Sequence, residues 1–180
     1  VLRTGVSFLG NLEDEEQDII DMGDRLIASL PSMLLYWYQW HHKQERIALE
    51  SSDPTIAGYF LHLLHGKEAS EEYRHCLDVS LTLYAEHEFN ASTFTCRTVA
   101  STLADYHSAV VAGIGALRGP LHGGANEWAM LLLERMKDPD YAEAAILKMF
   151  ADKELVMGFG HRVYTQGDPR SPIIKEYSRQ

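Results

Sequence analysis

Residues 106–126 read YHSAVVAGIGALRGPLHGGAN, the stretch that is most informative about the fold. Its first part, Tyr106–Leu117, is apolar on most faces and carries Ala and Gly at positions that recur with helical spacing. Small residues let a second helix approach closely, and a helix that is apolar all round is a buried one. The sequence therefore predicts a central core helix, followed by a glycine-rich turn that contains His122.

Signals for helix starts recur along the rest of the chain. An N-cap side chain accepts an otherwise unpaired backbone N–H, and proline loses nothing by following it at the first helical position. Acidic residues in a first turn face the positive end of the helix dipole. The alternation typical of a strand persists nowhere, residues 155–157 being only a short candidate, so the predicted fold class is all-α. Helices are expected to begin at Asn11, Pro31, Asp53-Pro54, Ser70, Asp138-Pro139 and Ser171-Pro172.

The composition restricts the classes of function. The chain has 180 residues, of which 46% are hydrophobic and 23% charged, so it can form a core. Its formal net charge of −10, without a basic cluster, argues against a nucleic-acid partner, because such a chain repels phosphate backbones. No apolar run has the length of a membrane span. Two cysteines, Cys76 and Cys96, make no disulfide framework, which fits a cytoplasmic location.

The two ends of the sequence favour a piece of a longer protein. The first residues, VLRT, show neither an initiator Met nor the pattern of a signal peptide. The last residues, IIKEYSRQ, have the character of a helix interior. We therefore expect this chain to be an internal fragment.

Three of the nine histidines differ from the rest, because each lies at a break in the expected helices. His87 follows the helix that begins near Ser70, His122 lies in the glycine-rich turn, and His161 ends the segment GFGH. Arg170 closes a Gly-Asp-Pro turn shortly after His161. Neutral imidazoles donate to a carbonyl or accept a proton, and arginine binds a carboxylate with two parallel hydrogen bonds. These residues predict a site for a small anionic oxo acid.

Other interpretations of the histidines predict different chemistry. His87, His122 and His161 could form a three-histidine zinc site, although no short-spaced ligand pair occurs among them. A non-catalytic helical interaction module is a third interpretation, but it predicts no placing of glycines around histidines. The remaining histidines lie on expected helices, where a surface or core role is the simpler interpretation: His41, His42, His62, His65, His75 and His107.

The segments around the three histidines resemble the signatures of the citrate synthase family. Residues 119–126, GPLHGGAN, are similar to its G-P-x-H-G-G-A-N segment, and residues 158–170 are similar to its G-x-G-H…D-P-R segment. Residues 87–93, HEFNAST, resemble its third signature, and the order and spacing also match. The resemblance covers the whole chain as an interior stretch of a longer family member. Within the family the likeness is to bacterial 2-methylcitrate synthases, on residues 3–7, 34–38 and 60–66.

The resemblance implies the condensation of a short acyl-CoA with oxaloacetate, with roles for particular residues. His122 would stabilise the enol or enolate of the acyl-CoA, and His161 would polarise the oxaloacetate carbonyl. His87 would help to hold oxaloacetate, and Arg170 would bind its carboxylate. No cofactor and no metal are implied, since the CoA thioester is a substrate. The adenine end of CoA would pack on a loop of Leu155, Val156, Met157, Gly158, Phe159 and Gly160.

The resemblance also implies two helical domains. Residues 1–123 would belong to the large domain and residues 124–180 to a truncated small domain, with oxaloacetate in the cleft between them. Family members are homodimers built through helices of the large domain. The family's catalytic base is an aspartate that lies beyond these residues, so the isolated chain is expected to be inactive. The resemblance favours a transferase of propionate metabolism that uses propionyl-CoA; the alternative is citrate synthase proper, which uses acetyl-CoA.

Overall fold

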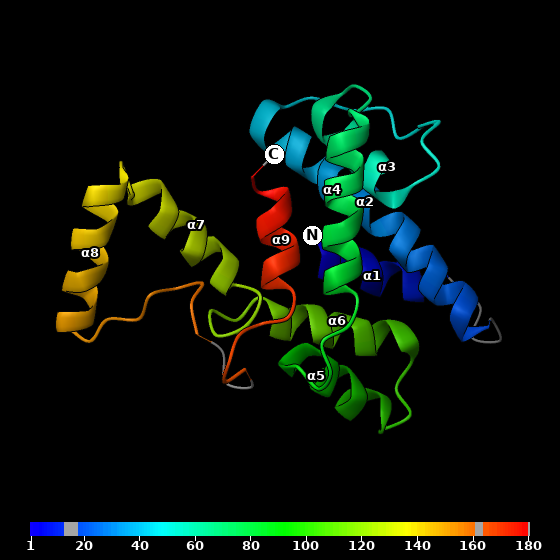
Figure 1. Ribbon diagram of the computed structural model, residues 1–180. Coiled ribbons are helices and arrows are strands. Elements are labelled where there is room, and N and C mark those ends of the chain that lie inside the picture. The colour runs from blue at the N-terminus through cyan, green and yellow to red at the C-terminus, as the bar shows by residue number, and fades with distance from the viewer. Residues whose placement is uncertain (13–17, 161–163, 180) are drawn as a thin grey trace.

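The computed structural model describes residues 1–12, 18–160 and 164–179, and these residues form helices and loops without a strand (Figure 1). The all-α class that the sequence predicts is therefore confirmed, and residues 155–157, the short strand candidate, are loop and turn. The helices are α1 (Leu2–Gly10), α2 (Ile19–Lys43), α3 (Ile56–His65), α4 (Glu71–Tyr84), α5 (Ala91–Ala100), α6 (Tyr106–Leu117), α7 (Ala125–Arg135), α8 (Pro139–Ala151) and α9 (Ser171–Tyr177).

Helix α6 is the predicted core helix; the structure confirms its packed position, although its Ser108 and Leu117 are exposed. Both α5 and α1 pack against α6. His107 and Ala109 of α6 are buried. Gly113 permits the close approach of α5, because a Cβ at this position would lie 2.3 Å from Sγ of Cys96. Gly10 does the same for α1, where an added Cβ would lie 2.9 Å from Cβ of His107.

Helices α2, α3 and α4 pack in sequence, α2 on α3 and α3 on α4. Gln39 is buried on α2 and donates from Nε2 to the carbonyl oxygens of Leu63 at 3.1 Å and Leu64 at 2.6 Å. These carbonyl oxygens lie in the last turn of α3, where they accept no backbone N–H from within the helix. Gln39 therefore ties the end of α3 to α2 by hydrogen bonds as well as by apolar packing.

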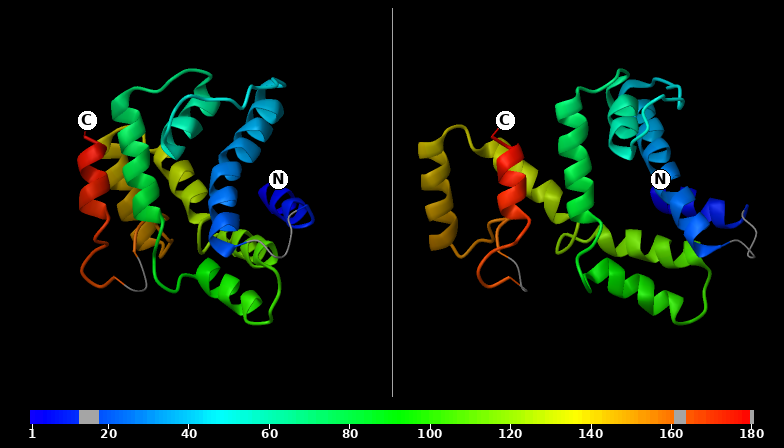
Figure 2. Two further views of the ribbon diagram at one scale, coloured as in Figure 1. Left: turned by 90° about the vertical axis from the view of Figure 1, so that its right-hand side faces the viewer. Right: turned by 45° about the vertical axis from the view of Figure 1, so that its right-hand side comes forward.

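Helices α7, α8 and α9 follow the group formed by α1–α6. Helices α7 and α8 follow each other around a short turn and extend away from α1–α6, and Figures 1 and 2 agree on this. Helix α9 returns toward α4, and the hydroxyl of Tyr177 on α9 lies 3.0 Å from Nε2 of His75 on α4. In the described part of the chain, no helix combines the length and the hydropathy that crossing a membrane demands.

Several of the predicted helix starts are confirmed. The side chain of Ser70 accepts a hydrogen bond from the backbone N–H of Tyr73, and α4 begins at the next residue. Asp138 caps α8 in the same way, and Pro139 is the first residue of that helix. Helix α3 begins slightly later than predicted, at Ile56, because Thr55 is the residue that caps it. The prediction at Ser171-Pro172 matches α9, whose cap position is held by Arg170.

Two predicted helix starts are wrong. Asn11 ends α1 instead of starting a helix, and its side chain donates to the carbonyl oxygen of Ser7 at 2.8 Å. The following helix, α2, is capped by Asp18. Pro31 lies inside α2 and is buried, as is Leu35 about one turn later in the same helix. Burying the apolar face of this long helix stabilises it by more than the loss of the one backbone hydrogen bond that proline removes. Tertiary packing thus overrides the local preference of proline for a helix start.

Candidate active site

His122 lies in the tight turn between α6 and α7, and that turn is closed by its own backbone. The N–H of Gly124 donates to the carbonyl oxygens of Leu117 at 3.0 Å and Gly119 at 3.1 Å, and the N–H of His122 donates to Gly119 at 2.9 Å. Glycine is required at position 124, because an added Cβ would lie 2.5 Å from the carbonyl oxygen of Arg118. Backbone hydrogen bonds thus hold the predicted glycine-rich turn in one conformation, and the turn sets the position of the His122 imidazole.

The ring of His122 is held by Ser92, in the first turn of α5. The backbone N–H of Ser92 donates to Nε2 of His122 at 3.3 Å, and Oγ of Ser92 lies 2.9 Å from the same nitrogen. A backbone N–H can only donate, so Nε2 accepts, and the neutral imidazole then carries its proton on Nδ1. The arrangement therefore presents His122 as a neutral hydrogen-bond donor at Nδ1.

Asn90 stands behind Ser92. Its Oδ1 caps α5 by accepting from the N–H of Thr93 at 3.0 Å, and it also lies 2.7 Å from Oγ of Ser92. The Ser92 hydroxyl is therefore placed between Oδ1 of Asn90 and Nε2 of His122. One residue both begins the helix and orients the group that contacts the histidine.

His87 lies in the loop between α4 and α5, as predicted, a few residues before the cap of α5. Its imidazole is half-buried and lies parallel to the ring of Tyr164, with 5.6 Å between the ring centroids and 3° between the planes. The hydroxyl of Tyr164 lies 3.4 Å from Nδ1 of His87. The structure thus brings the predicted His87 against the segment that leads to Arg170.

Arg170 is held by Asp168. Its Nε donates to both carboxylate oxygens of Asp168, at 2.9 and 3.2 Å, and its Nη2 donates to Oδ2 at 2.6 Å. The side-chain hydrogen bonds from Arg170 lower the pKa of Asp168 from 3.8 to about 2 against the opposing effect of burial, with a smaller contribution from the charge of His87. The same hydrogen bonds raise the pKa of Arg170. The guanidinium is therefore fixed before any substrate arrives.

The remaining predicted site residues are His161 and the loop of residues 155–160. His161 lies outside the described residues, so the three-histidine zinc interpretation, which needs it, stays a prediction. The predicted CoA loop follows α8 and is exposed at Leu155 and Phe159, each 75% accessible to solvent. Gly158 and Gly160 adopt φ of 92° and 78°, the left-handed conformation that glycine adopts without strain. The role of this loop in binding CoA stays a prediction.

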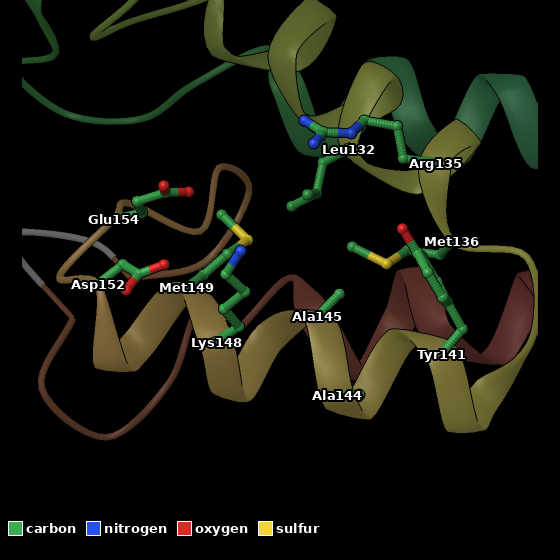
Figure 3. A pocket seen from close by; sticks show the side chains of 10 residues that line it. All are labelled: Leu132, Arg135, Met136, Tyr141, Ala144, Ala145, Lys148, Met149, Asp152 and Glu154. Atoms are coloured by element: carbon green, nitrogen blue, oxygen red, sulfur yellow. The ribbon is translucent and has the colours of Figure 1, made fainter.

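A separate cavity of about 400 Å³ lies between α7 and α8 (Figure 3). Leu132 of α7 and Met136 and Met149 point into it, and its charged lining is mixed: Arg135 and Lys148 are basic, whereas Asp152 and Glu154 are acidic. None of the predicted site residues that the structure describes lines this cavity. A second hollow, beside the loop of His87, is lined by Glu86, Glu88, Phe89, Thr93 and Arg97.

Ser92, Asn90 and Tyr164 are residues of the site that the sequence alone did not predict. The pattern Asn90-Ala91-Ser92-Thr93 is a helix-start signal, and it could have marked the cap of α5. No local signal connects Ser92 to His122, because the two residues are 30 positions apart. Likewise, Tyr164 and His87 are 77 positions apart.

Comparison with known proteins agrees with the site. The family described as citrate synthase, C-terminal domain, matches residues 1–180. The chain is 53% identical to a 2-methylcitrate synthase of Shewanella oneidensis, over all of this chain and 48% of that protein. It is 42% identical to a citrate synthase of Deinococcus radiodurans, over 98% of this chain and 48% of that protein. The chain therefore spans about half the length of these relatives.

Solved structures show the same relationship. A citrate synthase of Thermoplasma acidophilum, in a ternary complex with carboxymethyl coenzyme A and oxaloacetate, superposes with a TM-score of 0.82 at 32% identity, over 97% of this chain and 47% of that one. A citrate synthase of Pyrobaculum aerophilum also gives a TM-score of 0.82, at 34% identity over 99% of this chain and 48% of that one. Fold, sequence signatures and relatives agree, and the chain belongs to the citrate synthase family.

Proposed function

We propose that the protein carrying this chain is a 2-methylcitrate synthase, which condenses propionyl-CoA with oxaloacetate and hydrolyses the CoA thioester. The observation that carries the choice is the 53% identity to a protein named 2-methylcitrate synthase, compared with 42% to one named citrate synthase. The Thermoplasma structure, whose ligands are a CoA derivative and oxaloacetate, supports the two substrate classes.

His122 is the residue that we assign to the acyl-CoA. The α-proton of a thioester is a poor acid, so the enzyme must stabilise the charge that develops on the thioester oxygen. A neutral Nδ1–H that is already oriented can donate to this oxygen without reorganisation. The backbone N–H of Ser92 supports this role, because its donation to Nε2 favours the tautomer with the proton on Nδ1.

His87 and Arg170 are the residues that we assign to oxaloacetate, together with His161. A guanidinium has five N–H groups, and Asp168 takes only the Nε–H and one N–H of Nη2. Arginine is suited to a second carboxylate on its remaining edge, and the Asp168 contact reduces the entropy lost on binding. The contact between Tyr164 and His87 brings His87 against the segment that carries Arg170, which supports a shared pocket for these residues.

The organisation of the longer protein is part of the proposal. We assign residues 1–123 to a large domain and residues 124–180 to a small one; the separation of α7 and α8 from α1–α6 supports this boundary. Large apolar side chains such as Trp40, Trp128 and Phe150 are exposed on the described chain, which supports further covering segments and a homodimer. The loop of residues 155–160 is assigned to the adenine end of CoA.

Activity is proposed for the longer protein alone. By the resemblance, the catalytic aspartate is not among these residues, and Asp168 is engaged with Arg170. The purified 180-residue chain is therefore expected to show no condensation of propionyl-CoA with oxaloacetate. A measured release of CoA by that chain would contradict the assignment of the base.

Citrate synthase activity with acetyl-CoA is the second candidate, favoured by the relatives and solved structures that bear that name. The two substrates differ by one methyl group, which in an apolar pocket is worth about 1–3 kcal/mol, or roughly 10–200-fold in specificity. Measuring kcat/KM for both acyl-CoA substrates with the full-length protein decides between them. A higher kcat/KM for acetyl-CoA would reject the first proposal in favour of the second.

A further inference from the structure

Tyr164, in the loop before α9, contacts the loop between α4 and α5. Its hydroxyl lies 3.4 Å from Nδ1 of His87, and its ring is parallel to the imidazole, with 3° between the planes. Both side chains are half-buried. The contact connects His87 to the segment that carries Asp168 and Arg170.

A histidine that binds a substrate must present one tautomer in one ring orientation. A neighbouring aromatic ring in parallel contact restricts the orientation of the imidazole. A hydrogen bond at one ring nitrogen decides which nitrogen holds the proton. When the phenol of Tyr164 donates to Nδ1, neutral His87 carries its proton on Nε2 and is a donor there. A donor is what the carbonyl or carboxylate oxygens of an oxo acid require.

We propose that Tyr164 is a positioning residue for His87, fixing the ring and the tautomer with which His87 meets the oxo acid. The proposal rests on the proposed function, because it takes His87 as a group that touches oxaloacetate. Tyr164 acts through His87, so its loss affects the binding of oxaloacetate and leaves the acyl-CoA side of the reaction unaltered.

The chain offers a matched control in a second tyrosine–histidine pair. Tyr177 of α9 places its hydroxyl 3.0 Å from Nε2 of His75 on α4, and the two rings meet edge to face with centroids 5.5 Å apart. This pair joins two helices and includes none of the predicted site residues. Removing its hydroxyl tests what the loss of a comparable contact does to the fold alone.

The test uses the full-length protein with Tyr164→Phe, which keeps the ring and removes the hydroxyl. Oxaloacetate affinity is measured by isothermal titration calorimetry, and the tautomer of His87 by ¹⁵N NMR of the imidazole. We expect the Kd for oxaloacetate to rise about threefold to tenfold, the effect of one neutral hydrogen bond. We also expect the spectrum of His87 to change from one tautomer to a mixture. The KM for propionyl-CoA at saturating oxaloacetate should stay at its original value, as should every quantity in Tyr177→Phe.

The outcomes separate this proposal from the proposed function. If His87→Ala weakens oxaloacetate binding while Tyr164→Phe changes neither the Kd nor the tautomer, Tyr164 has no positioning role and the proposed function stands. If Tyr177→Phe produces the same loss as Tyr164→Phe, the effect is a general one on the fold, and the positioning role is rejected. If the unmodified full-length protein does not bind oxaloacetate, the proposed function fails and this proposal fails with it.

Discussion

The hydroxyl of Ser92 lies 2.9 Å from Nε2 of His122, and the backbone N–H of the same serine donates to that nitrogen at 3.3 Å. Ser92 is in the first turn of α5, whereas His122 is in the turn that follows α6. Because α5 and α6 pack closely, the orientation of the histidine depends on the packing of two helices.

Replacing Ser92 by Ala removes the hydroxyl contact to His122 and keeps the backbone one. We expect kcat of the full-length protein to fall about tenfold, because the imidazole loses the hydroxyl contact at Nε2 that helps to orient it, while the KM for oxaloacetate is unchanged. Steady-state kinetics with propionyl-CoA measures both. Ser80→Ala is the control, since the Ser80 hydroxyl bonds only a carbonyl of its own helix, that of Cys76 at 2.9 Å. Equal values of kcat for the two variants would contradict the role of Ser92.

Removing the cap of α5 should affect both stability and turnover. Asn90→Ala leaves the N–H of Thr93 without its acceptor and the Ser92 hydroxyl without its neighbour. We expect the free energy of unfolding to fall by about 1 kcal/mol and kcat to fall as well. Ser70→Ala, which removes the cap of α4, should cost a similar free energy and leave kcat unchanged. Urea denaturation and initial rates test the contrast, and a loss of kcat in both variants would refute it.

The turn around His122 should not tolerate a side chain at position 124. In Gly124→Ala the new Cβ would lie 2.5 Å from the carbonyl oxygen of Arg118, so the turn must shift. We expect the free energy of unfolding to fall by about 1–3 kcal/mol, with a loss of kcat. Gly115→Ala is the matched control on α6, where an added Cβ meets nothing within 4 Å. This control should raise stability by about 0.5–1 kcal/mol, as Ala does in a helix. Thermal unfolding measures the change in Tm of both variants. A change of the same sign in the two would contradict the steric requirement for glycine at position 124.

The Asp168–Arg170 pair predicts a dependence of stability on acid pH. The pKa of Asp168 is lowered from 3.8 to about 2, so the ionised carboxylate is favoured in the folded state. A lowered pKa contributes stability that is fully present above about pH 4 and is lost as the pH falls toward 2. The difference in unfolding free energy between the unmodified protein and Asp168→Asn should therefore be constant above pH 4 and shrink below it. Subtracting the two urea titrations cancels the other carboxylates, and a difference that does not vary with pH would contradict the assignment.

Much of the fold could be predicted from the chain itself. The all-α class, the buried helix over Tyr106–Leu117 and the starts of α4 and α8 follow from apolar patterning and capping chemistry, which act over a few residues. The same local reasoning was wrong at Pro31, where it expected a new helix. Pro31 lies on the buried face of α2, and burial of that face is a property of the whole packed chain.

Glycines, caps and prolines mark the breaks between helices locally, so the sequence is sufficient to place His87, His122 and Arg170 at such breaks. The side chains that contact these histidines follow from the tertiary packing instead. Ser92 reaches His122 across 30 positions and Tyr164 reaches His87 across 77, and both contacts exist because helices pack and carry their loops together. Local patterns cannot encode such pairs, since each partner satisfies its own local rules without the other.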